Sequence, residues 1–187
     1  MIDLSIVIVS YNTKDFLQKC IESIKETAKD FTYEIIVVDN ASGDGSSEMI
    51  KQKFKEVALI ENKANVGFSK ANNIGIKKTN GRYILFLNAD TVIYKNTLKT
   101  MLDFMDDTKD AGAATCKLIL STGKIDDASH RGFPTPWNSL AHFSGLSKIF
   151  PKTKFFGGYN LEFMDLDKTH EVDALAGAFM FVKREAG

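Results

Sequence analysis

The stretch Arg82-Tyr83-Ile84-Leu85-Phe86-Leu87-Asn88-Ala89-Asp90 is a run of large apolar residues that ends in polar ones. Turn-forming residues flank it, with Asn80-Gly81 before the run and Thr91 after it. A short apolar run between turn signals is typical of a strand that is buried on both faces, as the strands of parallel sheets are. Asp90 then lies at the carboxyl end of that strand, where open α/β sheets bind their ligands. The alternative is that Asp90 only terminates the strand in a solvated turn.

Strands and helices are expected to alternate on the amino-terminal side of this run and directly after it. The expected strands cover residues 4–9, 34–38, 57–61 and 82–87, and the expected helices cover residues 13–28, 47–54, 69–78 and 96–106. Strand-helix-strand units with short loops form parallel strands joined by right-handed crossovers. Residues 1–115 are therefore predicted to form a doubly wound α/β unit with a mostly parallel central sheet and helices on both faces.

The regular alternation stops after Cys116. Ser121-Thr122-Gly123 predicts a hairpin turn, residues 126–136 a loop, and residues 137–150 a helix. Eight of the fourteen Phe residues lie from Phe133 onward. Either they pack a small subdomain onto the sheet, or they form an apolar surface for an acceptor or a membrane.

The composition excludes several classes of protein. The chain has 187 residues, 44% hydrophobic residues, and 24 basic against 24 acidic residues, so no net charge draws it to nucleic acid. Cys20 and Cys116 have no metal-ligand spacing and are expected to be buried thiols in a reducing compartment. There is no basic leader and no apolar run near the ~20 residues of a membrane span. We therefore expect a cytoplasmic protein without a transmembrane segment, and peripheral attachment to the inner face of a membrane stays open.

Polar residues follow the expected strands at the point where each strand ends. Because parallel strands end at the same edge of a sheet, these side chains are expected to converge. There Tyr11 could stack on a base, Asp39 could accept a hydrogen bond from the imino N–H of a pyrimidine or guanine, and Asp90 could bind a hard divalent cation. The implied ligand is a nucleotide diphosphate. Alternatively, Tyr11 covers the sheet edge and Asp39 caps the following turn.

The segment of residues 65–76 enters the third helix. Gly67 suits a turn with positive φ, where free backbone N–H groups favour an anion. Asn72 and Asn73 are poor helix formers, so at least one of them is expected to contact the sugar or to tie the strand-end loops together. Lys70 could reach a phosphate or lie on a solvated face.

Several of these segments together resemble family 2 glycosyltransferases of the GT-A fold, in particular the rhamnosyltransferase-like bacterial branch. The resembling segments are residues 6–12 (IVIVSYN), 36–42 (IVVDNAS) with 44–46 (DGS), 65–75 (NVGFSKANNIG), 87–90 (LNAD), and 172–173, 177–180 and 183–185. The resemblance implies a Rossmann-like GT-A domain that transfers a sugar with inversion from a dTDP-, UDP- or GDP-sugar. The acceptor would be a glycan or a lipid-linked glycan, in polysaccharide biosynthesis of the cell envelope.

The resemblance also implies the residues of the donor site. Asp39 would contact the base, and Asp90 would bind Mg²⁺ or Mn²⁺ as the second acid of a D-x-D-like motif. Asn88 stands where that motif usually has its first Asp, so its role as a metal ligand is in doubt. The donor-binding residues expected in this way are Ser10, Tyr11, Asn12, Asp39, Asn65, Gly67, Phe68, Asn72, Asn73, Asn88, Ala89 and Asp90.

One segment of the family pattern has no counterpart before Gly187. Family members carry G-G-F-D and then an E-D pair beyond the Gly-Ala strand, and the Asp of that pair deprotonates the acceptor. Residues 116–187 are therefore expected to be a partial, irregular acceptor-side region without the catalytic base. Asp165, Asp167, Glu171 and Asp173 are expected to be loop or structural acids. The 187 residues should bind donor and transfer little or no sugar.

Two other functions compete with this interpretation. The residues of segment 88–92 (NADTV) imitate the D-x-D-x-[TV] signature of haloacid-dehalogenase-like phosphatases, but Asn88 cannot act as the nucleophile that this chemistry requires. The other alternative is a non-catalytic nucleotide-binding module. A dinucleotide-binding Rossmann domain is disfavoured because no G-x-G-x-x-G follows the first strand.

Overall fold

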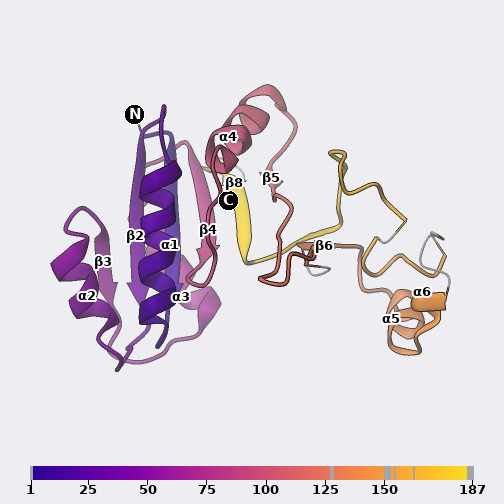
Figure 1. Ribbon diagram of the computed structural model, residues 1–187, viewed down its shortest axis with the longest axis horizontal. Helices are drawn as coiled ribbons and strands as arrows, with labels where there is room; N and C mark the ends of the chain where they lie inside the picture. Colours follow the sequence, from indigo (N-terminus) through magenta and orange to yellow (C-terminus); the bar gives the residue numbers. More distant parts are fainter. Residues whose placement is uncertain (1, 127–128, 150–152, 154, 162, 185–187) are drawn as a thin grey trace. The chain divides into compact units, whose positions relative to one another are not determined.

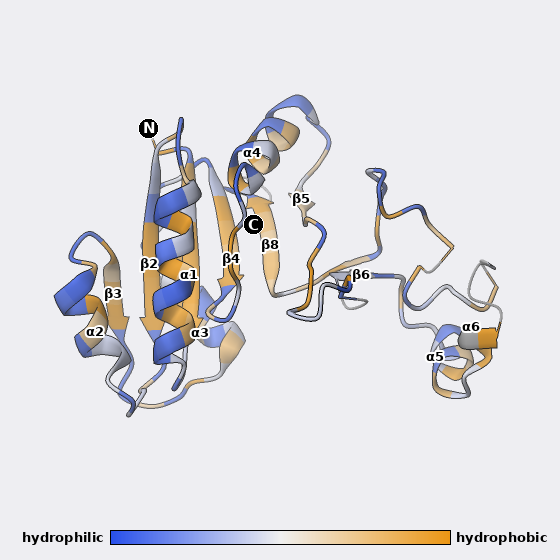
Figure 2. Cartoon of the chain, viewed as in Figure 1, coloured by the Kyte–Doolittle hydropathy of each residue, from blue (hydrophilic) through white to orange (hydrophobic). Residues whose placement is uncertain are grey.

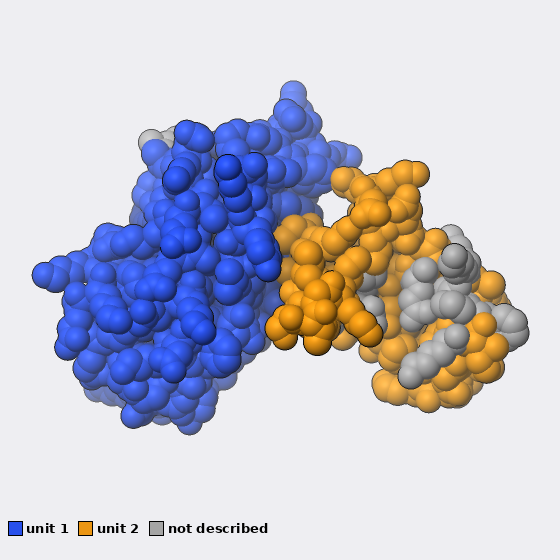
Figure 3. Space-filling view, viewed as in Figure 1, with its two compact units in different colours: residues 1–114, 177–187 blue, residues 115–176 orange. Residues whose placement is uncertain are grey.

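The computed structural model describes residues 2–126, 129–149, 153, 155–161 and 163–184. The chain divides into two compact units (Figure 3). Unit 1 is Met1–Ala114 with Gly177–Gly187, and unit 2 is Thr115–Ala176. Glu185, the last residue of the family-like segment 183–185, lies outside the described residues.

Unit 1 contains a six-stranded sheet in the order β3-β2-β1-β4-β8-β5 (Figure 1). Strands β1 to β4 are parallel, while β8 is antiparallel to both β4 and β5. The prediction of a mostly parallel central sheet is therefore confirmed. The strands are β1 Leu4–Ser10, β2 Tyr33–Asp39, β3 Ala58–Glu61, β4 Tyr83–Asn88, β5 Ala113–Ala114 and β8 Phe179–Lys183.

Four helices connect these strands: α1 Lys14–Thr27, α2 Ser46–Lys53, α3 Phe68–Ile76 and α4 Thr97–Asp107. The crossovers from β1 to β2 and β3 run in one direction along the sheet, and the crossover from β3 to β4 runs back past β1. Right-handed connections then require α1 and α2 to cover one face and α3 the other, as Figure 1 shows. The doubly wound arrangement is confirmed.

The sheet is the core of unit 1, and Figure 2 shows its central strands as hydrophobic beneath an amphipathic α1. Leu4, Ile6, Val7 and Ile8 of β1 are fully buried, because helices cover both faces of this strand. On the α3 face, Gly75 lies so close to the sheet that a Cβ atom there would stand 2.5 Å from Val7 Cγ1. The absence of a side chain at this position therefore lets α3 pack directly on the strands.

Strand β8 lies within residues 116–187, which the sequence predicts to be an irregular acceptor-side region. It pairs with β4 in the register Leu87↔Phe179, and Phe179 and Phe181 are almost fully buried. The backbone N–H of Asn88 donates to the carbonyl of Ala178 at 3.0 Å. The apolar run near the carboxyl end of the chain thus forms the strand next to β4, the strand that Asp90 follows.

Unit 2 has little regular structure. Its elements are β6 His130–Arg131, β7 Ala174–Leu175, α5 Pro136–Phe143 and α6 Leu146–Ile149, and β6 and β7 pair antiparallel. The predicted hairpin turn is confirmed by the antiparallel bridge Ile119↔Ile125 around Gly123, which has φ +80°. The prediction of one helix over residues 137–150 is wrong, because the chain turns at Gly145 with φ +80° and forms two short helices. Residues 127, 128 and 150 lie outside the described residues.

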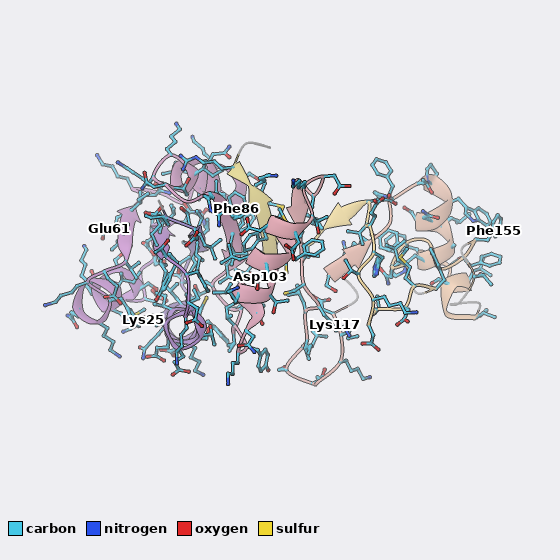
Figure 4. All side chains as sticks on the ribbon, turned by 90° about the horizontal axis from the view of Figure 1, so that it is seen from above. Lys25, Glu61, Phe86, Asp103, Lys117 and Phe155 are labelled. Carbon is cyan, nitrogen blue, oxygen red and sulfur yellow. The ribbon has the colours of Figure 1, made fainter. Side chains whose placement is uncertain are left out.

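Aromatic side chains in unit 2 are partly packed and partly exposed. The rings of Trp137 and Phe155 lie 4.9 Å apart, and Trp137 Nε1 donates to the carbonyl of Phe155 at 2.9 Å. Figure 4 marks Phe155 near α5, and Phe86 on β4 of unit 1. Phe133 and Phe143 are 66% and 79% exposed. In the described parts of the chain, no helix has the length and apolar character of a membrane span.

Candidate functional site

The carboxyl ends of β1, β2 and β4 meet at one edge of the sheet, here called the carboxyl edge. Ser10 at the end of β1 is paired with Asp39 of β2, and Val9 is paired with Asn88 of β4. Because neighbouring strands lie ~4.8 Å apart, Asp39 and Asn88 flank β1 at a separation of about 10 Å between strands. The strand-end residues named from the sequence are thus brought to one place.

Asp39 is buried, with 3% of its surface exposed. Its Oδ2 accepts a hydrogen bond from the backbone N–H of Ser42 at 3.0 Å, so this oxygen caps the turn after β2. Its Oδ1 is also buried, and among the described residues it has no hydrogen-bond partner. A buried carboxylate oxygen without a partner is costly, and such an atom calls for a donor from a ligand or a water molecule.

The two loops that flank Asp39 are joined to each other. Asn12, with φ +54°, donates its backbone N–H to Ser42 Oγ at 2.9 Å, and its Oδ1 accepts from the N–H of Gly43 at 2.8 Å. Asp44 accepts from the backbone N–H of Lys14 at 2.8 Å. These contacts occupy Asn12 in holding the β1-α1 loop to the β2-α2 loop.

Hydrogen bonds also stabilise the charge of Asp44. Although burial raises the pKa of Asp44, hydrogen bonds from the Ser46 hydroxyl and from the backbone of Lys14 and Ser46 hold it below the usual value.

Ser10 is fully buried, and its hydroxyl lies 2.9 Å from that of Thr13. Ser10 and Asp44 therefore shape the site from within rather than from its surface.

A network of three Asn side chains ties the third strand-end loop to this edge. Asn40 donates its Nδ2 to Asn65 Oδ1 at 2.9 Å, and its Oδ1 accepts from Asn62 Nδ2 at 3.0 Å and from the backbone N–H of Val66 at 3.1 Å. Asn65 Oδ1 also accepts from the N–H of Gly67 at 3.0 Å. The network therefore spans from the end of β2 to the start of α3.

From the sequence, Asn72 or Asn73 is expected either to contact the sugar or to tie the strand-end loops together, and the structure gives the tying role to other residues. Asn72 donates its Nδ2 to the carbonyl of Phe68 at 3.2 Å within its own helix, and Asn73 is exposed. Asn40 was not among the expected donor-binding residues. The available signal was its position directly after Asp39 at a strand end, where an amide can reach the loops on both sides.

The amino-terminal end of α3 lies open at the carboxyl edge. Gly67 has φ +84° as expected from the sequence, and the first helical residues, Phe68 to Lys70, are exposed. No acidic residue lies in the first turn. The backbone N–H groups of a helix start carry partial positive charge and favour an anion, so this end suits a phosphate better than a cation.

Two aromatic side chains stand at the same edge. Tyr11 and Phe68 are each 49% exposed. An exposed aromatic face at a ligand edge can stack on a planar base or cover a sugar ring. The geometry is compatible with both interpretations of Tyr11 made from the sequence.

The end of β4 carries the candidate metal ligand. Asp90 is exposed, Ala89 is buried, and Asn88 is partly buried with its carbonyl accepting from the N–H of Thr91 at 3.2 Å. Cys20 lies nearby, and burial, with a further effect of the Asp90 charge, raises the pKa of its thiol to about 12.

Asp90 is an exposed carboxylate at this end of β4. Among the described residues, no group of three or more His, Cys, Asp or Glu side chains could hold a metal ion. Mg²⁺ in nucleotide sites commonly takes one or two carboxylates and completes its shell with phosphate oxygens and water. The donor set thus fits a cation that is bound together with a diphosphate, and does not fit a cation bound by protein alone.

Comparison with known proteins gives a consistent set of relatives. Residues 5–183 match the family model described as glycosyl transferase family 2. An uncharacterized glycosyltransferase of Rickettsia felis is 34% identical over 153 residues, which are 80% of this chain and 23% of that protein. A poly(ribitol-phosphate) beta-glucosyltransferase of Bacillus spizizenii is 32% identical over 136 residues, 70% of this chain and 20% of that protein. The chain thus spans about a fifth of the length of these relatives.

Solved structures share the fold at lower sequence identity. TarS 1-349 of S. aureus has a TM-score of 0.58 and 23% identity, over 73% of this chain and 40% of that chain. The mannosyltransferase PcManGT of Pyrobaculum calidifontis, in complex with GDP-Man and Mn²⁺, has a TM-score of 0.56 and 22% identity, over 63% of this chain and 35% of that chain. At this level of identity the likeness concerns the fold.

Proposed function

The chain belongs to glycosyl transferase family 2 and has the GT-A fold, and from that premise we propose that its carboxyl edge binds the nucleotide diphosphate of a sugar donor. The observation that carries the proposal is the buried Oδ1 of Asp39, which has no partner among the described residues. A ligand that brings an N–H to this atom removes the cost of leaving it unpaired.

The chemistry of Asp39 selects among the bases. Uracil and thymine carry an imino N–H at N3, and guanine carries one at N1, whereas the corresponding nitrogens of cytosine and adenine are acceptors. A carboxylate, which accepts hydrogen bonds, can pair with that imino N–H, and we therefore propose UDP-, dTDP- or GDP-sugars as donors. Structures of TarS with UDP and with UDP-GlcNAc, and of PcManGT with GDP-Man, are consistent with this class of donor.

The other strand ends would hold the remaining parts of the donor. Tyr11 would stack on the base, and the backbone at Gly67 and Phe68 would face the diphosphate. Asp90 would hold Mg²⁺ or Mn²⁺ together with diphosphate oxygens, with Ala89 in the adjoining backbone and Asn88 as a neutral neighbour. A cation bound there supplies positive charge that stabilises the departing diphosphate. The loops around the donor would be fixed by Ser10, Asn12 and Asn65. The side of α3 toward the donor would carry Asn72 and Asn73.

The proposed reaction is an inverting transfer of a hexosyl or rhamnosyl group to a glycan or lipid-linked acceptor in polysaccharide biosynthesis, in the cytoplasm. Three of the four acids of unit 2 named from the sequence are engaged otherwise. Asp167 pairs with Lys117 at 2.6 Å, Asp165 pairs with Lys168 at 3.3 Å, and Asp173 accepts from the N–H of Phe133 at 2.8 Å. We therefore assign the general base to none of these three residues.

Titration calorimetry with five nucleoside diphosphates tests the proposal. UDP, dTDP and GDP should bind in the presence of Mn²⁺ or Mg²⁺ and bind more weakly with EDTA, while ADP and CDP should bind much more weakly than the best of the three. Equal binding of all five, or none in a folded sample, would overturn the assignment of Asp39.

A further inference from the structure

We propose that Asn40 is a positioning residue that holds loop 62–67, and with it the start of α3, in the arrangement that receives the donor. This inference rests on the proposed donor site. It assigns a function to a residue that is not among the expected donor-binding residues but contacts two other segments around the site, the end of β1 and loop 62–67.

The position of Asn40 suits this role. It is 2% exposed, and its backbone N–H donates to the carbonyl of Ser10 at 2.8 Å, which fixes Asn40 to the end of β1. Its side chain then makes three hydrogen bonds to loop 62–67, to Asn62, Asn65 and the backbone of Val66. One buried amide thus connects a rigid strand end with a loop whose residues 63–65 are exposed.

The orientation of the amides in this network is fixed by backbone groups. Asn40 Oδ1 accepts from the N–H of Val66, and Asn65 Oδ1 accepts from the N–H of Gly67, and neither backbone donor can reverse its role. The nitrogen of Asn40 must therefore donate to Asn65, and the carbonyl oxygen of Asn65 serves Asn40 and Gly67 together. A change at residue 40 is thereby transmitted to Gly67, the residue directly before α3.

This arrangement predicts distinct effects for two substitutions. Asn40→Ala removes all three side-chain bonds. Asn40→Asp keeps an oxygen for Asn62 and Val66, but it places a second oxygen against Asn65 Oδ1. Asn65 can relieve this repulsion only by rotating its amide, and the N–H of Gly67 then loses its acceptor. If the ordered loop falls to about a tenth of the population, the apparent donor affinity falls about tenfold.

The test compares wild type with Asn40→Ala, Asn40→Asp and Asn65→Ala, and uses Asn80→Ala as a matched control. Asn80 is also an Asn with side-chain hydrogen bonds, to Glu34 Oε2 and to the carbonyl of Lys78, but it lies at the opposite edge of the sheet. Amide hydrogen exchange, read by NMR on the ligand-free proteins, reports loop order. Calorimetry with UDP, dTDP and GDP in Mn²⁺ reports affinity, at a temperature where all variants are folded by circular dichroism.

We expect exchange of the Gly67 amide at least about tenfold faster in the three network variants, and of the Val66 amide mainly in Asn40→Ala. The amides of β1 and β2 should keep their protection. Nucleotide affinity should fall about tenfold or more in the network variants and stay unchanged in Asn80→Ala. Because Asn65 is exposed, Asn65→Ala should fold even if a variant at residue 40 does not.

Two outcomes overturn the inference while leaving the proposed function intact. One is unchanged exchange at Gly67 in the network variants, and the other is lost protection with undiminished nucleotide affinity. If wild type binds none of the three nucleotides, the proposed function fails and the donor-binding part of the inference fails with it. The exchange data then still decide whether Asn40 orders the loop.

Discussion

The sheet of unit 1 carries charged and polar residues at both ends of its strands. The two edges differ in how far these side chains are hydrogen-bonded to one another. At the edge opposite the carboxyl edge, here called the amino edge because the amino ends of β1, β2 and β4 lie there, Ser5 Oγ donates to Glu34 at 2.6 Å and accepts from the N–H of Gly81 at 2.8 Å. Arg82 lies between Asp3 and Asp106, at 3.0 and 2.9 Å. These groups satisfy one another, so the amino edge is a closed structural network.

The carboxyl edge leaves its groups available. Asp39 Oδ1 is the one buried side-chain oxygen or nitrogen of unit 1 that lacks a hydrogen-bond partner, within the described part of the chain. Asp90, Tyr11 and Phe68 are exposed at the same edge. The difference teaches that a polar residue at a strand end is not informative by itself, whereas a polar atom without a partner points to a ligand.

The largest expected effect tests how tightly the amino edge is packed. In Gly81→Ala, the new Cβ would stand 2.6 Å from the backbone nitrogen of Ser5 and 2.8 Å from the carbonyl oxygen of Tyr83. Because backbone atoms cannot move aside cheaply, we expect the free energy of unfolding to fall by about 3 kcal/mol, measured by urea denaturation.

A glycine from the carboxyl edge provides the control. A Cβ at Gly43 would meet no atom within 4 Å, so Gly43→Ala should change the free energy of unfolding by less than about 0.5 kcal/mol. Similar destabilisation by both substitutions would show that the edges do not differ in packing.

The second prediction replaces one carboxylate at each edge by a neutral amide. Asp39→Asn replaces a carboxylate by a weaker acceptor, and since hydrogen bonds to charged groups contribute about 1.5–3 kcal/mol, nucleotide affinity should fall about 10²-fold. The free energy of unfolding should stay the same or rise, because a buried charge with an unpartnered oxygen is removed. Calorimetry and urea denaturation measure the two quantities.

Asp106→Asn is the matching change at the amino edge. Asp106 accepts from Arg82 and from the hydroxyl of Tyr83 at 2.7 Å, so the variant should lose about 1 kcal/mol of stability and keep its nucleotide affinity. If Asp106→Asn weakened nucleotide binding as much as Asp39→Asn, the proposed division between the edges would be wrong.

Much of this fold could be predicted from periodicity alone. Buried strands such as Leu4–Ser10 and amphipathic helices such as Lys14–Thr27 can be recognised in the sequence. The spacing of their apolar residues indicates both the type of element and which of its residues are buried. The parallel arrangement followed from their alternation. Strand β8 could not be assigned in the same way, since its pairing with β4 joins residues about 90 positions apart and depends on tertiary structure.

The candidate site was predictable in its location and less so in its details. Strand ends bring Ser10, Asp39 and Asn88 together by topology, and that could be inferred from the sequence. The sequence does not show which amide ties the loops together. The side chains of Asn40, Asn65, Asn72 and Asn73 have the same hydrogen-bonding groups, and only the distances in the structure distinguish them. In unit 2, the apolar pattern predicts a helix through Gly145, because the positive φ of this glycine is not visible in the pattern.

The third prediction concerns the metal. Asp90→Asn should weaken nucleotide diphosphate binding about 10-fold in Mn²⁺ and should reduce the difference in affinity between Mn²⁺ and EDTA, because the proposed protein carboxylate for the cation is lost. Since Asp90 is exposed, the free energy of unfolding should change by less than about 0.5 kcal/mol. An unchanged response to EDTA would remove Asp90 from the metal site.

The smallest expected effect is the acid sensitivity of the amino edge. Hydrogen bonds from the backbone and hydroxyl of Thr32, helped by Arg82, lower the pKa of Asp3 to about 2 despite partial burial. A carboxyl whose pKa is lowered in the folded state stabilises the fold above its unfolded pKa of ~3.9, and loses that contribution as the pH falls toward 2. Allowing for solvent screening, we expect wild type to lose about 1 kcal/mol more than Asp3→Asn between pH 5 and pH 2.5.

Urea denaturation at several pH values measures this difference, and Asp39→Asn serves as the comparison from the other edge. The Asp39 variant should retain the Asp3-dependent loss, because the contacts of Asp3 with Thr32 and Arg82 lie at the amino edge and are unaffected. An identical pH profile for wild type and Asp3→Asn would mean that the network around Arg82 does not stabilise the fold. The closed character of the amino edge would then rest on its packing at Gly81 and on the bonds of Ser5 rather than on its ion pairs.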